Sequence, residues 1–225
     1  MRDLQNLHGR ANACIACHHH LDSDILAAGH PELIFELDGQ SVSQPKHWVE
    51  ASNWRGAQAW LVGQAVALRE TSWRLAEART KDEDQIARWQ ALVWLLLKVD
   101  DSLAQITDST ASNTLVSAQK SSDDLARRTA ASEWSTDMTR KHLRKLAATH
   151  DEFRRPTPPR LFHARRAERL ALALDRLLTD LTPNPKLTDT DGQLNKVFEA
   201  AQSLQDFEPN KFADLLQQFE SRLPP

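Results

Sequence analysis

The pattern in this sequence that could do chemistry is a pentapeptide near the N-terminus, Cys14 to His18, which has the form C-x-x-C-H. It contains both cysteines of the chain, so neither is left for another site. A disulfide between Cys14 and Cys17 would close a very small loop and add little stability. The close spacing therefore indicates redox chemistry, a metal site or a covalent cofactor.

C-x-x-C-H is the attachment signature of c-type haem. In such a site the two thiols form thioethers with two vinyl groups on one edge of the porphyrin, and the imidazole that follows binds the iron. The sequence thus predicts one haem c per chain, anchored by Cys14 and Cys17, with His18 as the proximal ligand. The axial ligands and their surroundings would set the reduction potential.

The second axial ligand has several candidates, because the first 50 residues hold six of the nine histidines. His30 is the first choice, since Gly29 and Pro31 hold it in a stiff turn, and His47 is the second. The other histidines of this stretch rank behind them: His8, His19 and His20. If none of them binds, the iron keeps an open position, which would favour a haem sensor or enzyme over simple electron transfer.

Three other chemistries fit a C-x-x-C pair. A thioredoxin-like pair would follow a core strand and open a helix, whereas the residues before Cys14 have no strand pattern. A closed zinc site would combine both cysteines with two of four nearby histidines, namely His18, His19, His20 and His30. The zinc site belongs to a second function, a haem-free helical interaction protein. Reduced, inert cysteines in a buried turn are the remaining alternative.

Apolar residues recur at helical spacing along most of the chain that would hold this site in place. The sequence predicts an all-α fold, a helical bundle that carries a loop-rich N-terminal haem-binding lobe. The lobe covers residues 1–50 and the bundle residues 51–225, with a possible sub-boundary at 154–160, where prolines end a helix. Within the lobe, Pro31 could begin a helix, although ELIFEL (Glu32 to Leu37) also has the alternation of a short strand.

The bundle helices are predicted from apolar spacing. In the first, GAQAWLVGQAVALRETSWRLAEAR, one face holds Ala59, Val62, Val66, Trp73 and Ala76. A second begins near Glu83 and carries apolar positions as far as Leu103 and Ile106. A third region covers about 113–153, with Trp134, Leu143, Leu146 and His150 on its inner face. Later helices are expected at about 161–181, 192–205 and 209–222.

Composition limits the functions that fit. A net charge of −3 does not indicate a general nucleic-acid surface. The longest apolar run, Ala91 to Val99, contains Lys98 and is too short to cross a bilayer, so no membrane insertion is expected. No phosphate loop, H-E-x-x-H or nucleophile elbow occurs, which favours an electron carrier over an enzyme. Six arginines at 154–169 could dock an acidic redox partner, or simply form a solvated linker and helix face.

The stretch CIACHHHLDSDILAAGHPELIFELDGQSVSQPKHW resembles a segment of multihaem c-type cytochromes, the family related to the tetrahaem cytochrome that accepts electrons from hydroxylamine oxidoreductase. The shared elements are C-x-x-C-H, AAGHP (Ala27 to Pro31), FE (Phe35 and Glu36) and P-x-H-W (Pro45 to Trp48). A helix rich in tryptophan and alanine follows in both, and the likeness covers about residues 10–105. The resemblance implies periplasmic electron transfer through histidine-ligated haem, with redox partner proteins and other haem-bearing subunits as partners.

Three features depart from the family pattern. This chain has one C-x-x-C-H where relatives have several, and it has Ser23 in a region where they usually have a histidine. It also starts at Met1 without the export signal of relatives, which would make it cytoplasmic if Met1 is the native start. The single haem motif and the missing export signal fit the C-terminal part of a longer multihaem protein, or a missed start, or a paralogue that has lost export and haem.

Overall fold

The computed structural model describes residues 4–19, 24–25, 28–30, 33–38, 50, 54–181 and 189–223. The fold is all-α, as the periodicity predicts, and the described residues contain no strand. The helices are α1 (Leu7–His18), α4 (Gly56–Glu77), α5 (Glu83–Leu97), α6 (Ser112–Ala131), α7 (Thr136–Ala147), α8 (His150–Phe153), α9 (Arg160–Leu181), α10 (Asp189–Gln202) and α11 (Pro209–Glu220), with a 3-10 turn η1 (Asp101–Leu103). None of the helices in these ranges is both long and apolar enough to cross a membrane.

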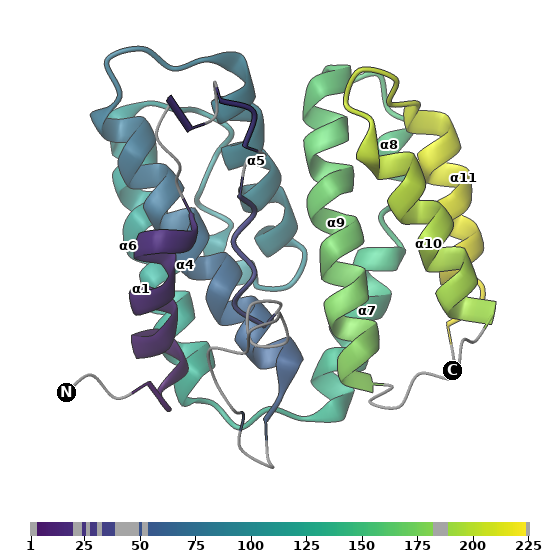
Figure 1. Ribbon diagram of the computed structural model, residues 1–225, viewed down its shortest axis with the longest axis horizontal. Helices are drawn as coiled ribbons and strands as arrows, with labels where there is room; N and C mark the ends of the chain where they lie inside the picture. Colours follow the sequence, from purple (N-terminus) through teal and green to yellow (C-terminus); the bar gives the residue numbers. More distant parts are fainter. Residues whose placement is uncertain are drawn as a thin grey trace.

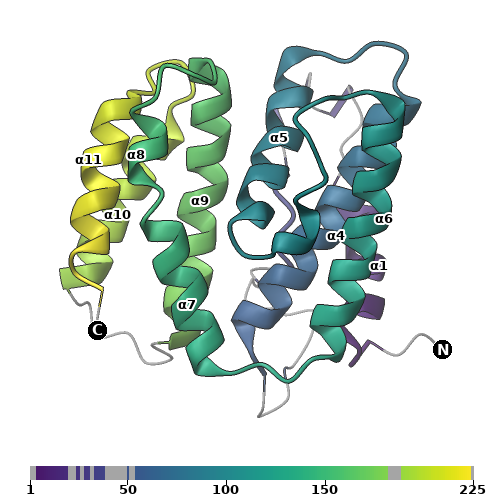
Figure 2. The same ribbon diagram turned by 180° about the vertical axis from the view of Figure 1, so that it is seen from behind.

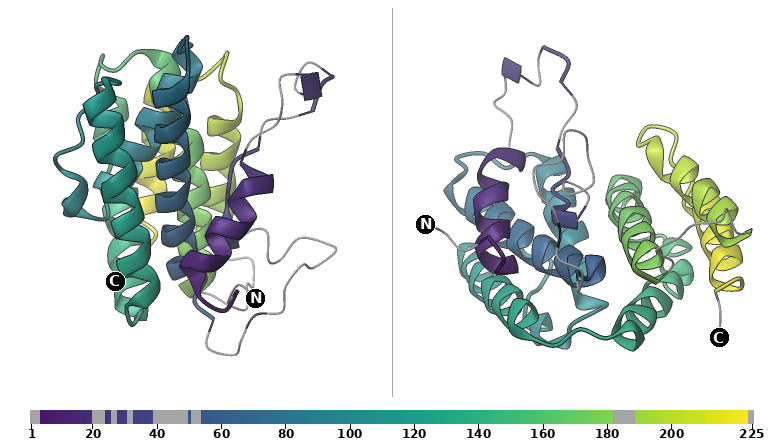
Figure 3. Two further views of the ribbon diagram at one scale, coloured as in Figure 1. Left: turned by 90° about the vertical axis from the view of Figure 1, so that its left-hand side faces the viewer. Right: turned by 60° about the horizontal axis from the view of Figure 1, so that its bottom comes forward.

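The helices form two groups that lie side by side (Figure 1). One group holds α1, α4, α5 and α6, and the other holds α7 to α11, as the reverse view also shows (Figure 2). The groups meet where α9 packs against α5 and α4, and one hydrophobic cluster runs through both, from Ala11 to Phe219. Helix α1 packs on α4 and α6 at the side of the molecule away from α10 and α11 (Figure 3).

Helix α4 is the centre of the first group. Every residue from Ala59 to Leu68 is buried, because alanine, glycine and valine let neighbours approach this helix from several sides. Three residues of the predicted apolar face, Ala59, Val62 and Val66, are buried as expected. Trp73 is not, because 50% of its surface is exposed. Burial of the last two turns is instead centred on Ser72 and Leu75, where the Trp89 indole nitrogen donates to the Ser72 hydroxyl at 2.8 Å.

Helix α5 begins where the sequence predicts. The Asp82 carboxylate caps it by accepting a hydrogen bond from the Gln85 amide at 2.8 Å. The helix ends at Leu97, however, so Leu103 and Ile106 lie beyond it. Both are nevertheless buried, because Asp100 caps η1, and this turn folds the chain back onto the core.

The predicted region 113–153 is three helices, α6, α7 and the short α8. The break lies at Ser132–Ser135, where the Ser135 hydroxyl accepts from the Met138 amide and caps α7. Leu143 and Leu146 are buried as expected, whereas Trp134 and His150 are half-buried. The three later helices form close to their predicted bounds.

The N-terminal lobe is more regular at its start than its sequence indicates. Residues expected to be irregular form α1, whose first turn is capped by the Asn6 side chain, which accepts from the Gly9 amide at 2.9 Å. Pro31, expected to begin a helix, lies outside the described residues. The residues that follow, Leu33 to Glu36, are neither helix nor strand, so both expectations for ELIFEL are wrong there.

Candidate cofactor-attachment site

Cys14, Cys17 and His18 all lie in the C-terminal half of α1, and His18 is its last residue. Residues three apart on a helix lie on the same face about one turn apart, so the two cysteine side chains lie on neighbouring turns. Both cysteines are free thiols. Cys14 is half-buried and packs against the hydrophobic core, Cys17 is exposed and His18 is half-buried. The two thiols therefore offer one anchor toward the protein and one toward solvent.

The environment of Cys14 favours a neutral thiol. Burial raises its pKa, and although the positive charge of Arg10 acts to lower it, Cys17 acts to raise it further. A thioredoxin-type cysteine is instead a thiolate stabilised by its surroundings. The pair lies near the end of a helix that no strand precedes in the described residues, which also differs from a thioredoxin setting.

Arg10, one turn before Cys14, ties this face of α1 to the rest of the lobe. Its Nη1 donates to both carboxylate oxygens of Glu50, at 2.8 and 2.9 Å, and so forms an ion pair. The same guanidinium lies over the Trp54 ring, 4.9 Å from its centroid. The Trp54 indole nitrogen in turn donates to Asp38 at 3.1 Å. A chain of direct contacts thus leads from the cysteine face of α1 to the 33–38 segment.

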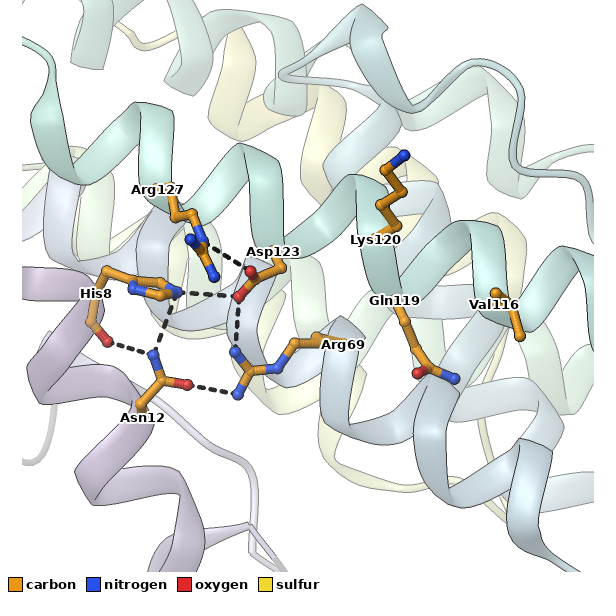
Figure 4. Close-up of a pocket in the computed structure, with 8 residues that line it drawn as sticks. All are labelled: His8, Asn12, Arg69, Val116, Gln119, Lys120, Asp123 and Arg127. Carbon is orange, nitrogen blue, oxygen red and sulfur yellow. Dashed lines mark hydrogen bonds and ion pairs between the residues drawn. The ribbon is translucent and has the colours of Figure 1, made fainter.

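The opposite flank of α1 is held by a second polar cluster (Figure 4). The His8 ring nitrogen Nε2 lies 3.0 Å from Asp123 of α6, and Arg69 of α4 donates to the same carboxylate oxygen at 2.7 Å. Arg127 binds the other oxygen at 2.8 Å, and Asn12 joins His8 to Arg69. Burial acts to raise the pKa of Asp123, but hydrogen bonds from His8, Arg69 and Arg127 lower it to about 2. These contacts fix α1 on α4 and α6.

The candidates for a second axial ligand are in different situations. His30 is exposed and follows Gly29, whose φ of +93° makes the tight turn that was expected before it. His8 is engaged by Asp123, and His19 Nε2 lies 3.1 Å from the Thr71 hydroxyl. His47, like His20, lies outside the described residues. The identity of this ligand stays a prediction.

No three His, Cys, Asp or Glu side chains within the described ranges gather into a group that could hold a metal ion. A zinc site made of Cys14, Cys17 and two described histidines is therefore not assembled in this structure. The donor set at the end of α1 does fit covalent haem attachment. It offers two free thiols on one helical face for the porphyrin edge, with the imidazole of His18 next in the chain.

A buried acid lies in the same lobe, in a setting that sequence patterns did not reveal. Glu36 is 8% exposed, and its Oε1 accepts a hydrogen bond from the Gln64 amide at 2.8 Å. Its other oxygen, Oε2, is buried without a hydrogen-bond partner. Burial raises the pKa of Glu36 to about 7, although the positive charges of Arg169 and Arg176 act against it. A carboxylic acid with this pKa exchanges its proton near neutral pH.

Helix α4 is shaped to receive the segment that carries Glu36. Gly63 leaves room for Leu37, whose Cβ would lie 2.8 Å from a Cβ placed on that glycine. The Gln64 amide also donates to the backbone carbonyl of Phe35 at 3.1 Å. Phe35 and Leu37 are buried, Leu33 is half-buried, and Glu36 is buried as well, so burial here does not alternate along the segment.

The six arginines of residues 154–169 do not form one surface. Arg165 binds both carboxylate oxygens of Asp84 on α5, each at 2.7 Å, and its side chain is 7% exposed. Arg169 is buried and donates to Gln64 at 3.4 Å. Arg154 pairs with Asp214 of α11 at 2.7 Å. These three arginines join helices to one another, so neither a shared docking surface nor a solvated face describes the whole stretch.

Comparisons with protein-family models, curated proteins and solved structures gave no match to this chain. The function is therefore inferred from the residues themselves and from the geometry around them. The C-x-x-C-H pattern on α1 is the feature with the most specific chemistry. The buried Ala11 and Ile15 and the polar clusters on the two flanks of α1 hold it in place.

Proposed function

We propose that this protein is an electron carrier with one covalently attached haem c. Cys14 and Cys17 form the two thioether bonds, and His18 is the proximal ligand. The observation that carries the proposal is the pair of free thiols on one face of α1 with an imidazole directly after them. The resemblance of residues 10–105 to multihaem c-type cytochromes supports the same conclusion. When bound, the haem supplies a one-electron couple between ferric and ferrous iron.

The chain itself contributes rigidity and an asymmetric environment. Two polar clusters hold α1, one through Arg10 and Glu50 and the other through His8 and Asp123. A site fixed on a braced helix keeps its geometry when the charge of the cofactor changes. The half-buried Cys14 keeps one attachment point against the core, while the exposed Cys17 leaves the other at the surface, where a partner protein has access.

Further parts of the proposal come from the resemblance. His30 is proposed as the distal ligand, with His47 as the second choice, and either could ligate a haem on another haem-bearing subunit. The partners would be redox proteins. Because c-type haem attachment takes place outside the cytoplasm, the proposed location is the periplasm.

The first test is the intact mass and visible spectrum of the protein, produced with export and a c-haem maturation system. We expect a covalent adduct of one haem with sharp reduced bands. The double variant Cys14→Ala/Cys17→Ala should lose the adduct while keeping its helical circular dichroism, because alanine favours a helix and the change removes only the half-buried Cys14 sulfur from the edge of the core. A matched control is Ser109→Ala, a small substitution in the loop before α6, which should keep the adduct.

Two outcomes would contradict the proposal. A haem-free mass after maturation would show that the pentapeptide does not attach haem. Stoichiometric zinc that is lost, together with structure, on adding a chelator would indicate the interaction-protein alternative. For a haem-loaded protein, carbon monoxide binding to the reduced form would identify an open iron site and so a sensor or enzyme. His30→Ala should create such binding if His30 is the distal ligand.

A further inference from the structure

Glu36 differs from the acidic residues around it in having an unused acceptor atom. Asp38, in the same segment, accepts a hydrogen bond from Trp54, and Glu50 is engaged through both oxygens by Arg10. Asp180 of α9 is bound by Arg55 at 2.8 Å. Glu36 has one hydrogen bond, from Gln64, and a buried Oε2 with none. A proton on Oε2 would therefore displace no existing donor.

Three parts of the chain face Glu36, and two of them carry charged groups. Gln64 of α4 is neutral and donates through its amide. Arg169 and Arg176 of α9 act to stabilise the ionised carboxylate, and Asp38 of its own segment acts to destabilise it. Burial outweighs the two arginines, so the acid lies close to balance between its two protonation states at neutral pH. In such a position a small change in nearby charge changes the protonation state.

Glu36 is connected to the cysteine face of α1 by the contacts described above. Arg10 shares that face with Cys14, lies over Trp54, and reaches Asp38 through the Trp54 indole. Asp38 is two residues from Glu36 in a segment packed on α4. The connection runs through buried and half-buried groups, where charges are poorly screened by water.

We propose that Glu36 is a proton-binding site coupled to the redox state of this protein, taking up one proton when the attached haem gains an electron. This inference rests on the proposed function. The electron comes from a donor redox protein and the proton from solvent water. The carboxylate binds the proton as an O–H bond at Oε2, so that reduction adds no net charge to the lobe. On oxidation the electron leaves to the acceptor and the O–H bond releases its proton.

The test is the midpoint potential of the haem-loaded protein between about pH 6 and pH 8, on both sides of the pKa of about 7. In the wild type the potential should fall as pH rises, because proton uptake accompanies reduction. Glu36→Gln mimics the protonated acid in shape, so its potential should lie above that of the wild type at about pH 8 and vary less with pH. The matched control is Glu152→Gln. Burial acts to raise the pKa of Glu152, but hydrogen bonds from Lys98 and Trp94 lower it, so Glu152 does not titrate in this range.

A second measurement gives its main result on the wild-type protein, without any variant. The infrared difference spectrum between reduced and oxidised wild-type protein should show the carbonyl band of a protonated carboxylic acid gained on reduction. Glutamate labelled with ¹³C should shift that band, which identifies the residue type. In Glu36→Gln the band should be absent.

The outcomes separate the two proposals. A protein that carries haem but shows the same pH dependence in wild type and Glu36→Gln, or no carboxylic band on reduction, would overturn the coupling and leave the electron carrier intact. A protein that carries no haem would overturn the proposed function, and the coupling with it. The visible spectrum decides between these cases before any potential is measured.

Discussion

Replacing Gly63 with alanine tests how closely the 33–38 segment is packed against α4. A Cβ at this position would lie 2.8 Å from the Cβ of Leu37 and 3.2 Å from its backbone nitrogen. These atoms cannot move away by a rotation of the side chain. The segment itself must shift, and Phe35 and Leu37, which are both buried, must shift with it.

Two opposite effects determine how much Gly63→Ala changes the free energy of unfolding. Helix propensity alone favours alanine over glycine within a helix by about 1 kcal/mol. Forcing an extra methyl group into a packed core typically costs about 1–3 kcal/mol. Releasing the segment instead would expose two large apolar side chains, each worth about 1.5–3 kcal/mol when buried. The overlap outweighs the gain in propensity, and the difference between them is at most about 2 kcal/mol. We therefore expect Gly63→Ala to lower the free energy of unfolding by about 1 kcal/mol.

The assay is urea denaturation followed by far-ultraviolet circular dichroism, with Gly192→Ala as the matched control. Gly192 lies in α10, and a Cβ there would meet nothing within 4 Å. The control should gain about 0.5–1 kcal/mol from helix propensity alone. If Gly63→Ala is stabilised as much as Gly192→Ala, then the 33–38 segment is not packed on α4 as described, and the account of the buried Glu36 site is wrong.

Three further predictions concern charged groups. Because burial raises the pKa of Glu36 from 4.5 to about 7, the folded protein retains a proton that the unfolded chain releases between these values. The free energy of unfolding should therefore fall by about 3 kcal/mol as pH rises from 4.5 to 7. Glu36→Gln should abolish that part of the dependence in pH-resolved urea titrations, and an unchanged slope would refute it. For Asp123, burial acts to raise the pKa but hydrogen bonds, first from His8, lower it to about 2. Its contribution is present above about pH 4 and is lost as pH falls toward 2. After allowance for solvent screening, Asp123→Asn should cost on the order of 1 kcal/mol at neutral pH by thermal unfolding, and no loss would contradict the role of this cluster. Arg165→Leu should cost about 2–3 kcal/mol. Its effect should be less than additive with Asp84→Asn in a double-mutant cycle, whereas full additivity would show that the pair is not coupled.

The sequence predicted most of the helices, because their signals are local. Prolines between Arg155 and Arg160 end one helix and precede α9, which forms at Arg160–Leu181 against a predicted 161–181. The break between α6 and α7 was missed, although Ser135 is a good N-cap, because apolar spacing continues across it. Trp73 shows the limit of helical periodicity. A position on the apolar face of a helix is buried only where a neighbouring element covers it.

In the candidate site too, features carried by local sequence could be predicted, whereas features that depend on tertiary contacts could not. The C-x-x-C-H pattern is visible in the sequence because five consecutive residues carry it. The groups around it are not, because Glu36 and Gln64 are 28 residues apart, and His8 and Asp123 are 115 apart. Nothing in the spacing of such residues indicates contact, and tertiary packing alone brings them together. A buried polar residue in an apolar stretch, such as Glu36 between Phe35 and Leu37, is the one local signal that could have directed attention to this site.

The most direct test of the central claim is a peptide map of the protein after maturation and export. Trypsin should release residues 11–46, which contain both cysteines, as one peptide. We predict that this peptide carries one haem that survives denaturation and acid, with Cys14 and Cys17 both protected from alkylation. An unmodified peptide with two alkylated cysteines would show that the C-x-x-C-H pattern of α1 does not bind haem covalently, and would contradict the account.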